Sequence, residues 1–253
     1  MKKLLYIFVI VAVVCFAGSA RAAGFANETL HYVVTYKWGL IHKDAGEATL
    51  RLRNAGDKYQ IQLSARTKPW ADRFYNLRDT LLSTISRQGL KPVSYTRIAH
   101  EGGRYNRDVL TYSRTGNTVH AHAACERINK KGQYFSHENN FKAQGPAYDI
   151  LSVFYYLRTI NYATLTANKA IKVRIFSGSK VETLTVRSVG KEKIKLRNKS
   201  VREAYHIKFR FTTDGNKKSS EDISAWISTD PAHIPLQLVG SLPIGQIRCY
   251  YIP

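Results

Sequence analysis

The segment from Gly145 to Ile160 constrains the fold most, because it is the one long stretch after the N-terminal region with helical spacing of apolar residues. Pro146 fits at or just before a first helical turn, and Asp149 brings a carboxylate to the positive end of the helix dipole. The segment is apolar on nearly every side, which is typical of a buried helix. We therefore predict a central buried helix over about 147–160.

Most of the remaining chain alternates apolar and polar residues over short runs that turn residues separate, as β-strands do. Two such meanders are predicted, over about 27–125 and 170–253, with the helix between them. The polar run Glu126–Asn140 contains Gly132 and is predicted to be a mobile loop. The fold class is therefore mainly β: one domain over 23–253, an antiparallel curved sheet or an incompletely closed β-barrel.

The first 22 residues are predicted to be a signal peptide. Lys2 and Lys3 precede an apolar run over Leu4–Phe16, and Ala20-Arg21-Ala22 matches a small-residue cleavage site. The apolar run is shorter than a bilayer span, and no later stretch is long enough, so we expect no transmembrane helix after cleavage. The protein is expected to be periplasmic or otherwise exported. Cys15 follows Val14 where lipoprotein signals need a small residue, so we expect no lipid anchor.

The chain is strongly basic, with 39 Lys and Arg against 18 Asp and Glu and a formal net charge of +21. The predicted signal peptide holds three of the basic groups and no acid, which leaves +18. This charge favours anionic partners: anionic lipid, lipopolysaccharide or acidic glycan, with peripheral membrane contact. Nucleic acid is not expected, since an exported β protein rarely meets it and no nucleic-acid-binding signature occurs.

The basic side chains of the second half follow a pattern. On successive predicted strands apolar residues take one face, and Lys or Arg takes the other. If these strands are neighbours, one outer face carries a basic ligand-binding field of Lys172, Arg174, Lys193, Lys195, Arg197, Lys208 and Arg210. The alternative is a solvated sheet face whose lysines protect the edge strands.

Two tryptophans are the other ligand-binding candidates. Trp38 and Trp70 lie beside predicted loops, where a side chain can line the mouth of a cavity. Buried packing is the alternative for each.

Two cysteines remain after residue 22, Cys125 and Cys249. In an oxidising compartment they can form a disulfide, and the alternative is a pair of buried free thiols. His120 and His122 would share one face of a strand, and Cys125 follows closely, so these residues are weak metal-ligand candidates. No fourth ligand is evident, and we assign no metal and no cofactor.

Catalytic motifs are not evident. Gly178-Ser179-Lys180 resembles the end of a phosphate loop, but strands flank it, so a hairpin turn is predicted. The acid pairs Asp44 with Glu47 and Glu221 with Asp222 are predicted to be ion-paired in so basic a chain. We assign no catalytic residue.

Three segments together resemble a family of exported bacterial proteins called domain of unknown function 3108. They are Glu28-x-Leu30-x-Tyr32 with Tyr36, Gly39, Ala45 and Gly46 beyond; Asp149-Ile-Leu-Ser-Val-Phe-Tyr-Tyr-Leu-Arg158; and Trp226-x-x-x-Asp230-x-x-x-Ile234-Pro235-Leu236 with Gly245 beyond. The resemblance implies an envelope location and a β-rich fold, and it carries over no functional residue.

Residues of the last two motifs are expected to be structural: Asp149, Tyr155, Arg158, Trp226 and Asp230. A contact of Arg158 with Asp230, or of Asp149 with a basic strand, would fix the helix to the sheet.

The first functional hypothesis is an envelope binding or carrier module for an anionic or amphiphilic ligand, by architectural analogy with periplasmic lipoprotein carriers. The alternatives are an enzyme acting on an acidic envelope polymer and a structural component of an envelope assembly.

Overall fold

The computed structural model describes residues 24–166, 169–178, 180–213 and 220–253. The predicted signal peptide, with Lys2, Lys3 and Cys15, and the turn residue Ser179 lie outside the described residues.

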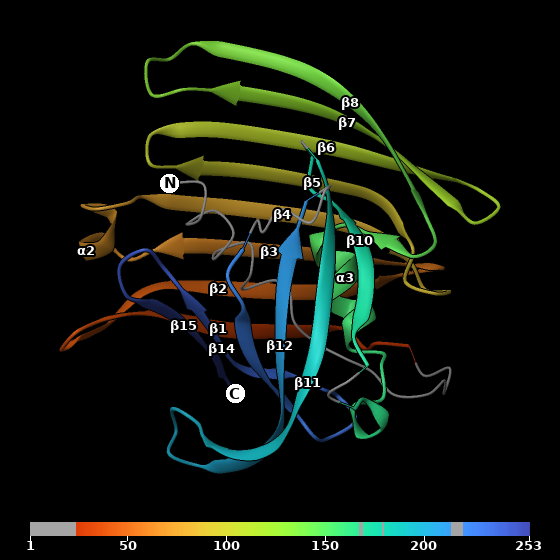
Figure 1. Cartoon of the computed structure of the whole chain (residues 1–253). Helices are drawn as coiled ribbons and strands as arrows, with labels where there is room; N and C mark the ends of the chain where they lie inside the picture. The colour runs from red at the N-terminus through yellow and green to blue at the C-terminus, as the bar shows by residue number, and fades with distance from the viewer. Residues whose placement is uncertain (1–23, 167–168, 179, 214–219) are drawn as a thin grey trace.

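The described residues form one 15-stranded sheet with the order β8-β7-β6-β5-β4-β3-β2-β1-β15-β14-β13-β12-β11-β10-β9 (Figure 1). Every neighbouring pair is antiparallel except β9 and β10. The strands are β1 Glu28–Trp38, β2 Ile41–Ala55, β3 Lys58–Thr67, β4 Leu77–Ser86, β5 Pro92–Glu101, β6 Arg104–Thr115, β7 Thr118–Ile128, β8 Tyr134–Gln144, β9 Ala147–Tyr148, β10 Ile171–Phe176, β11 Val181–Lys195, β12 Val201–Thr212, β13 Ile223–Ser228, β14 Pro235–Ser241 and β15 Gln246–Ile252.

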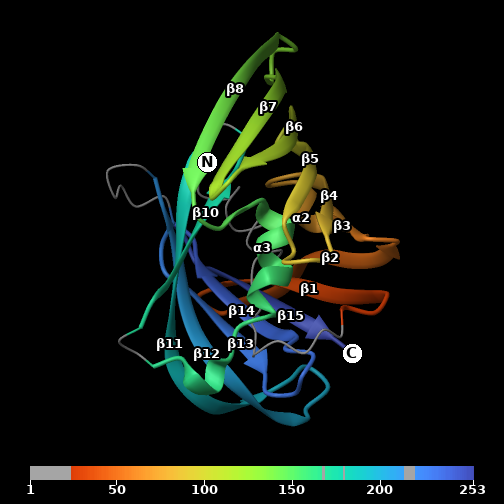
Figure 2. The ribbon, with the colours of Figure 1, turned by 90° about the vertical axis from the view of Figure 1, so that its right-hand side faces the viewer.

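The sheet curves into a nearly closed barrel with one seam, between the edge strands β8 and β9 (Figures 1 and 2). Near the seam, the turn between β10 and β11 meets the other wall, where the Gly178 carbonyl accepts from Cys125 Sγ at 3.4 Å and Asn139 Nδ2 at 3.5 Å. Gly178 has φ +77°, and a Cβ there would lie 2.7 Å from Asp108 Cγ. A side chain at this position would therefore push the two walls apart. The predicted β-barrel class is confirmed.

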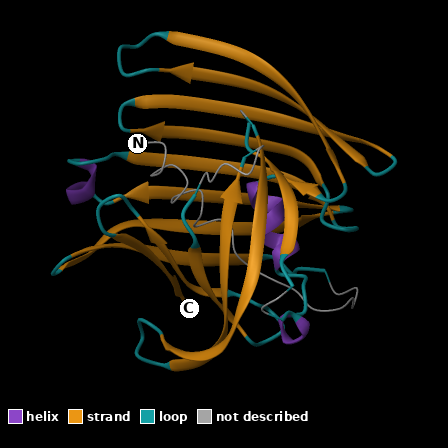
Figure 3. Cartoon of the chain, viewed as in Figure 1, coloured by secondary structure: helices purple, strands orange, loops and turns teal. Residues whose placement is uncertain are grey.

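The central helix α3, Ile150–Leu157, lies inside the curved sheet (Figures 2 and 3). Seven of its eight residues are buried: Ile150, Leu151, Ser152, Val153, Phe154, Tyr155 and Leu157. It packs against β3, β4, β9 and β10. The helix side chains therefore occupy the interior, as the all-round apolar pattern predicted. The described residues also contain two shorter helical segments, α2 Pro69–Asp72 and the 3-10 turn η1 Tyr162–Thr164.

The predicted helix start near 147 is wrong, because Ala147 and Tyr148 are extended. They form β9 and pair with Arg174 and Ile175 of β10. The helix also ends at Leu157 rather than near 160. The residues predicted as the first helical turn therefore form a short strand that pairs in parallel with β10, next to the seam.

Asp149 is the N-cap of α3 and is fully buried. Its Oδ1 accepts from the Leu151 and Ser152 amides, each at 2.8 Å, and Ser152 Oγ accepts from the Asp149 amide at 2.9 Å. Its Oδ2 accepts from the Ser83 hydroxyl of β4 at 2.9 Å. One carboxylate therefore satisfies the helix N-terminus and joins it to the sheet, with Ser83 in place of a basic strand residue.

The predicted contact of Arg158 with Asp230 is replaced by an ion pair with Glu28 at the start of β1. The Arg158 side chain also donates to the Ala232 carbonyl at 3.0 Å and lies over the rings of Phe25 and Tyr155. The Asp230 carboxylate instead accepts from the Ala232 amide at 3.0 Å, within its own turn. Arg158 thus holds both this turn and the first strand to the end of the helix.

The mobile loop predicted over Glu126–Asn140 is also wrong. β7 continues to Ile128, and β8 begins at Tyr134, so the connection is a short turn that contains Gly132 with φ +77°. The run is polar because β8 is an edge strand with mostly exposed side chains, and its backbone pairs with β7. Side-chain polarity alone did not reveal this pairing.

The disulfide is not formed, since both Cys125 and Cys249 are free and buried. Cys125 lies in β7 and Cys249 in β15, with six strands between them in the sheet order. A disulfide needs Cα atoms within about 7 Å, which this separation does not provide. Burial raises the pKa of the Cys125 thiol to about 11 and raises that of Cys249 as well.

Asp149→Ala is expected to lower the free energy of unfolding by about 1–3 kcal/mol, because the cap and the Ser83 bond are both lost. Asp149→Asn keeps an oxygen acceptor at the cap and is the matched control, with a smaller loss. Urea unfolding curves of both variants measure the difference. Equal stability of the two variants would contradict a capping role.

Thiol labelling of the native protein is expected to leave both cysteines unmodified, because each is buried and mostly protonated at neutral pH. Both should react with a maleimide after unfolding in urea without reductant. A mass lower by two hydrogens, with no label after unfolding, would show a disulfide instead.

Candidate functional site

The outer face of β10, β11 and β12 carries a group of positive side chains. These strands are neighbours, as the prediction required, and opposite residues of an antiparallel pair point to the same face. Lys172 and Arg210 flank Thr185 in one row across the three strands, while Arg174 pairs with Thr183, and Arg187 with Lys208. We call this group the basic field: Lys172, Arg174, Arg187, Lys208 and Arg210.

None of the five side chains of the basic field forms an ion pair with another described residue. Arg187 and Lys208 stand directly opposite each other in the register, where like charges destabilise a sheet. The apolar neighbours Val173, Val186 and Phe209 point inward and are buried. Sequence analysis missed Arg187, although its alternation with Val186 placed it on the basic face.

Lys193 and Lys195 do not belong to this face. The register of β11 and β12 shifts between Ser188 and Gly190, and this bulge reverses which residues of β11 point outward. Beyond it, Lys193 lies opposite Glu203 and Lys195 opposite Val201, on the face that carries Tyr205. The prediction failed here because it took the apolar neighbours Ile194 and Leu196 as inward, whereas they pack in a separate cluster with Ala204 and Leu236.

Arg197 is also separate from the basic field. It binds Asp44 through two hydrogen bonds of 2.7 and 2.9 Å, and it lies over the Tyr250 ring at 5.5 Å. The Arg197 guanidinium lowers the pKa of the Asp44 carboxyl. This contact ties the hairpin of β11 and β12 to β2.

The two tryptophans of the cavity prediction lie in different surroundings. Trp38 ends β1 with 54% of its surface exposed. Trp70 lies in α2, donates from Nε1 to the Asp44 carbonyl at 2.8 Å, and has Lys43 Nζ 4.7 Å from its ring. Trp70 therefore packs α2 against β2, while Trp38 stays accessible.

Trp226 and Tyr155 both make packing contacts with other aromatic rings. The Trp226 ring stacks on His206 at 4.5 Å, and its Nε1 donates to Glu192. The Tyr155 ring packs edge-on against Phe25 at 4.9 Å. Trp226 packs against a small cluster of Leu196, Ala204 and Leu236. Tyr155 lies in the main core, with Phe25 packed against it.

His120 and His122 share one face of β7, but Cys125 lies on the opposite, inner face and is buried. His122 Nδ1 lies 3.1 Å from Asn140 Oδ1. The described part of the chain contains no group of three or more His, Cys, Asp or Glu side chains that could hold a metal ion. Asp44 and Glu47, one of the two acid pairs noted in the sequence, form separate ion pairs. Asp44 binds Arg197, and Glu47 binds Arg66.

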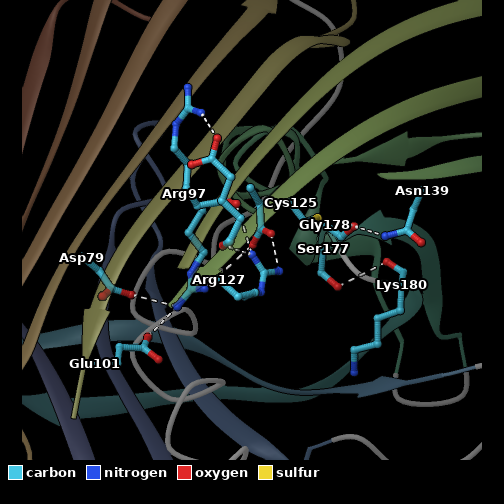
Figure 4. Close-up of polar contacts among 12 residues, drawn as sticks. Asp79, Arg97, Glu101, Cys125, Arg127, Asn139, Ser177, Gly178 and Lys180 are labelled. Atoms are coloured by element: carbon cyan, nitrogen blue, oxygen red, sulfur yellow. Dashed lines mark hydrogen bonds and ion pairs between the residues drawn. The ribbon is translucent and has the colours of Figure 1, made fainter. Parts of the chain in front are cut away.

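A buried charge cluster that sequence analysis missed lies on the inner face of β4 to β7 (Figure 4). Arg97 donates to Glu101 at 2.5 Å and to Asp79 at 3.2 Å, and Arg127 donates to Asp108 at 2.5 Å. Arg97 and Asp108 are opposite each other in the register, with Nη1 and Oδ2 4.0 Å apart. These charged residues occupy positions that alternate with more exposed ones along β4 to β7, as the buried apolar residues do. This alternation was the sequence signal that could have revealed the cluster.

Asp79 is the unusual group of the cluster. Burial and the nearby Glu101 raise its pKa to about 8, although Arg97 opposes the shift. Asp79 is therefore mostly protonated at neutral pH, which leaves two carboxylates facing two guanidinium groups. Such a shift is typical of functional sites but also of structural ion networks. The balance of charges here favours a structural network at one end of the barrel.

A polar depression of about 430 Å³ crosses the outer face of β2 to β5. Arg51 and Arg53 line it on β2, together with Gln60, Gln62, Thr84, Ser94 and Thr96 from the neighbouring strands. Its lining is mostly polar, and the exposed side chain of Leu82 adds an apolar contact. None of the described helices is long and apolar enough to cross a membrane.

The fold defines a class: a nearly closed β-barrel with a buried helix in its interior. The chain belongs to the family described as "Protein of unknown function (DUF3108)", whose model matches residues 31–250. The family resemblance of the three motifs is therefore confirmed. No match was found among curated proteins.

The fold is similar to the crystal structure of a beta-barrel-like protein of domain of unknown function DUF1849 from Brucella abortus. The TM-score is 0.58 at 10% sequence identity, and the alignment covers 91% of this chain and 97% of the other. At this identity the similarity concerns the fold alone.

Replacing Asp79 is expected to flatten the pH dependence of stability. A carboxyl group whose pKa rises from 3.8 unfolded to about 8 folded adds stability that is fully present below about pH 4 and lost as the pH rises through 8. From pH 5 to 9 the wild type should therefore lose on the order of 4 kcal/mol more than Asp79→Asn. Urea unfolding across this range measures the difference.

The matched control is Asp57→Asn, because the Asp57 side chain is 81% exposed. It should keep the wild-type slope. If Asp79→Asn shows that slope too, the Asp79 carboxyl does not hold its proton in the folded state.

Proposed function

We propose that the protein is an exported envelope module that binds an anionic ligand on the basic field. The main observation for this proposal is that Arg187 and Lys208 lie directly opposite each other on neighbouring strands. They belong to a group of five basic side chains, none of which forms an ion pair with another described residue. Phosphate or carboxylate groups between these side chains would relieve their repulsion. An anionic lipid, lipopolysaccharide or an acidic glycan carries such groups.

The filled interior of the barrel favours binding of a ligand at the surface over storage of acyl chains inside. The buried side chains of α3 fill the space that a hollow carrier would offer to lipid tails. The exported location is proposed from residues 1–22 alone, where Lys2 and Lys3 precede an apolar run and a small-residue cleavage site.

Lys208→Gln with Arg210→Gln is expected to weaken binding to anionic ligands by at least tenfold at low salt, because each basic group near an anionic surface contributes about 1 kcal/mol. The matched control is Lys193→Gln with Lys195→Gln, which removes the same charge from the same hairpin on the opposite face. Titrations with lipopolysaccharide, phosphatidylglycerol vesicles and an acidic glycan separate the ligand sources.

Equal weakening by the two variants would indicate attraction by net charge alone and would contradict a site. No binding of any of the three ligands by the wild type at low salt would remove the proposal.

A further inference from the structure

Two hairpins at one end of the barrel expose apolar side chains at their tips. The turn of β1 and β2 presents Trp38, Leu40 and Ile41, exposed by 54%, 104% and 46%, and the turn of β14 and β15 presents Ile244, exposed by 61%. We call these four residues the apolar tip. Side chains of this size gathered on protruding turns indicate a contact with an apolar environment.

The two turns are held together and are therefore preorganised. Tyr36 donates from its hydroxyl to the Ile244 carbonyl at 3.1 Å, and Lys37 pairs with Gln246 in the register. Gly245 has φ +80°, and a Cβ there would lie 2.4 Å from the Lys37 carbonyl and 3.2 Å from Trp38 Cβ. The glycine lets one turn rest directly on the other, so the apolar tip forms a single surface.

Positive side chains lie on the strands that lead to the apolar tip and on the nearby helix α2. Lys37 is in β1 and Lys43 in β2, while Lys68 and Arg73 cap the two ends of α2. None of the four forms an ion pair with another described residue, whereas the acids Asp44 and Asp72 are paired with Arg197 and Arg78. Trp70 holds α2 beside β2, and the next aromatic residue, Phe74, is 83% exposed. A tryptophan with aliphatic neighbours and a rim of lysines matches the boundary of an anionic bilayer.

A second aromatic pair lies at the same end of the meander. The turns of β1 with β2, β5 with β6 and β7 with β8 alternate with those at the other end, and Figure 1 shows them on the left. Tyr134 and Phe135, which begin β8, are exposed by 60% and 52%, and Lys130 and Lys131 precede them. One end of the barrel thus repeats the combination of aromatic and basic residues.

We propose that this end docks on the surface of an anionic phospholipid bilayer, with the apolar tip inserted among the headgroups. The inference goes beyond the proposed function and does not depend on the basic field, which lies on β10 to β12. Insertion would remove four apolar side chains from water, while the lysine rim would contact the lipid phosphates.

Flotation with phosphatidylglycerol vesicles tests the docking. Leu40→Ser with Ile41→Ser and Ile244→Ser is expected to lower vesicle partitioning by at least tenfold and to keep the wild-type unfolding midpoint, because these side chains are exposed. The control is Val189→Ser with Val201→Ser, which removes two side chains exposed by 51% and 61% from β11 and β12. This control should bind like the wild type.

Brominated lipids test insertion itself, since bromine on the acyl chain quenches a tryptophan that reaches it. Quenching is expected in the wild type and in Lys208→Gln with Arg210→Gln, and it should be lost in Trp38→Phe. Vesicle binding without quenching, or equal partitioning of the tip variant and the wild type, would overturn the proposal. A tip variant that changes the oligomeric state in light scattering, with unchanged vesicle binding, would identify a protein contact instead and also overturn it.

Discussion

The buried Asp149 carboxylate is the interaction on which the rest of the architecture depends. It lies in an apolar interior that raises its pKa, and it remains there because two helix amides and the Ser83 hydroxyl donate to it. This arrangement fixes where α3 starts and which wall the helix faces. The residues just before it are then free to extend as β9, and the sheet can wrap the helix from both sides.

Charge is separated between the inside and the outside of the barrel. The acids of the inner cluster, Glu101 and Asp108, are matched by Arg97 and Arg127, and Asp79 avoids ionisation by keeping its proton. Several other acids pair with surface arginines near the hairpins. The excess of positive charge therefore remains on the outer strands and around the apolar tip, where solvent or an anionic partner can meet it.

The similar DUF1849 structure shares the barrel-like fold. A fold by itself does not assign a function, so function has to be inferred from the surfaces of the chain. In this chain two surfaces differ in kind. The basic field is a flat group of charges on neighbouring strands, and the apolar tip is a preorganised protrusion with a positive rim. The first suits anionic groups in general, and the second suits a bilayer boundary, so separate variants can distinguish the two.

Periodicity by itself determined the buried helix, the strand-rich fold and the outward direction of Lys172, Arg174, Lys208 and Arg210, because these follow from local alternation and from residues near in sequence. The tertiary structure alone decided the pairing of β8 with β7 and of β9 with β10, the Glu28 partner of Arg158 and the buried cluster around Arg97. It also decided the bulge at Ser188 and Gly190, which turned Lys193 and Lys195 away from the basic field, and the contact of two distant turns that built the apolar tip. The physical reason is that backbone pairing and charge neutralisation join residues far apart in the chain, and a single inserted residue reverses every later side chain of a strand.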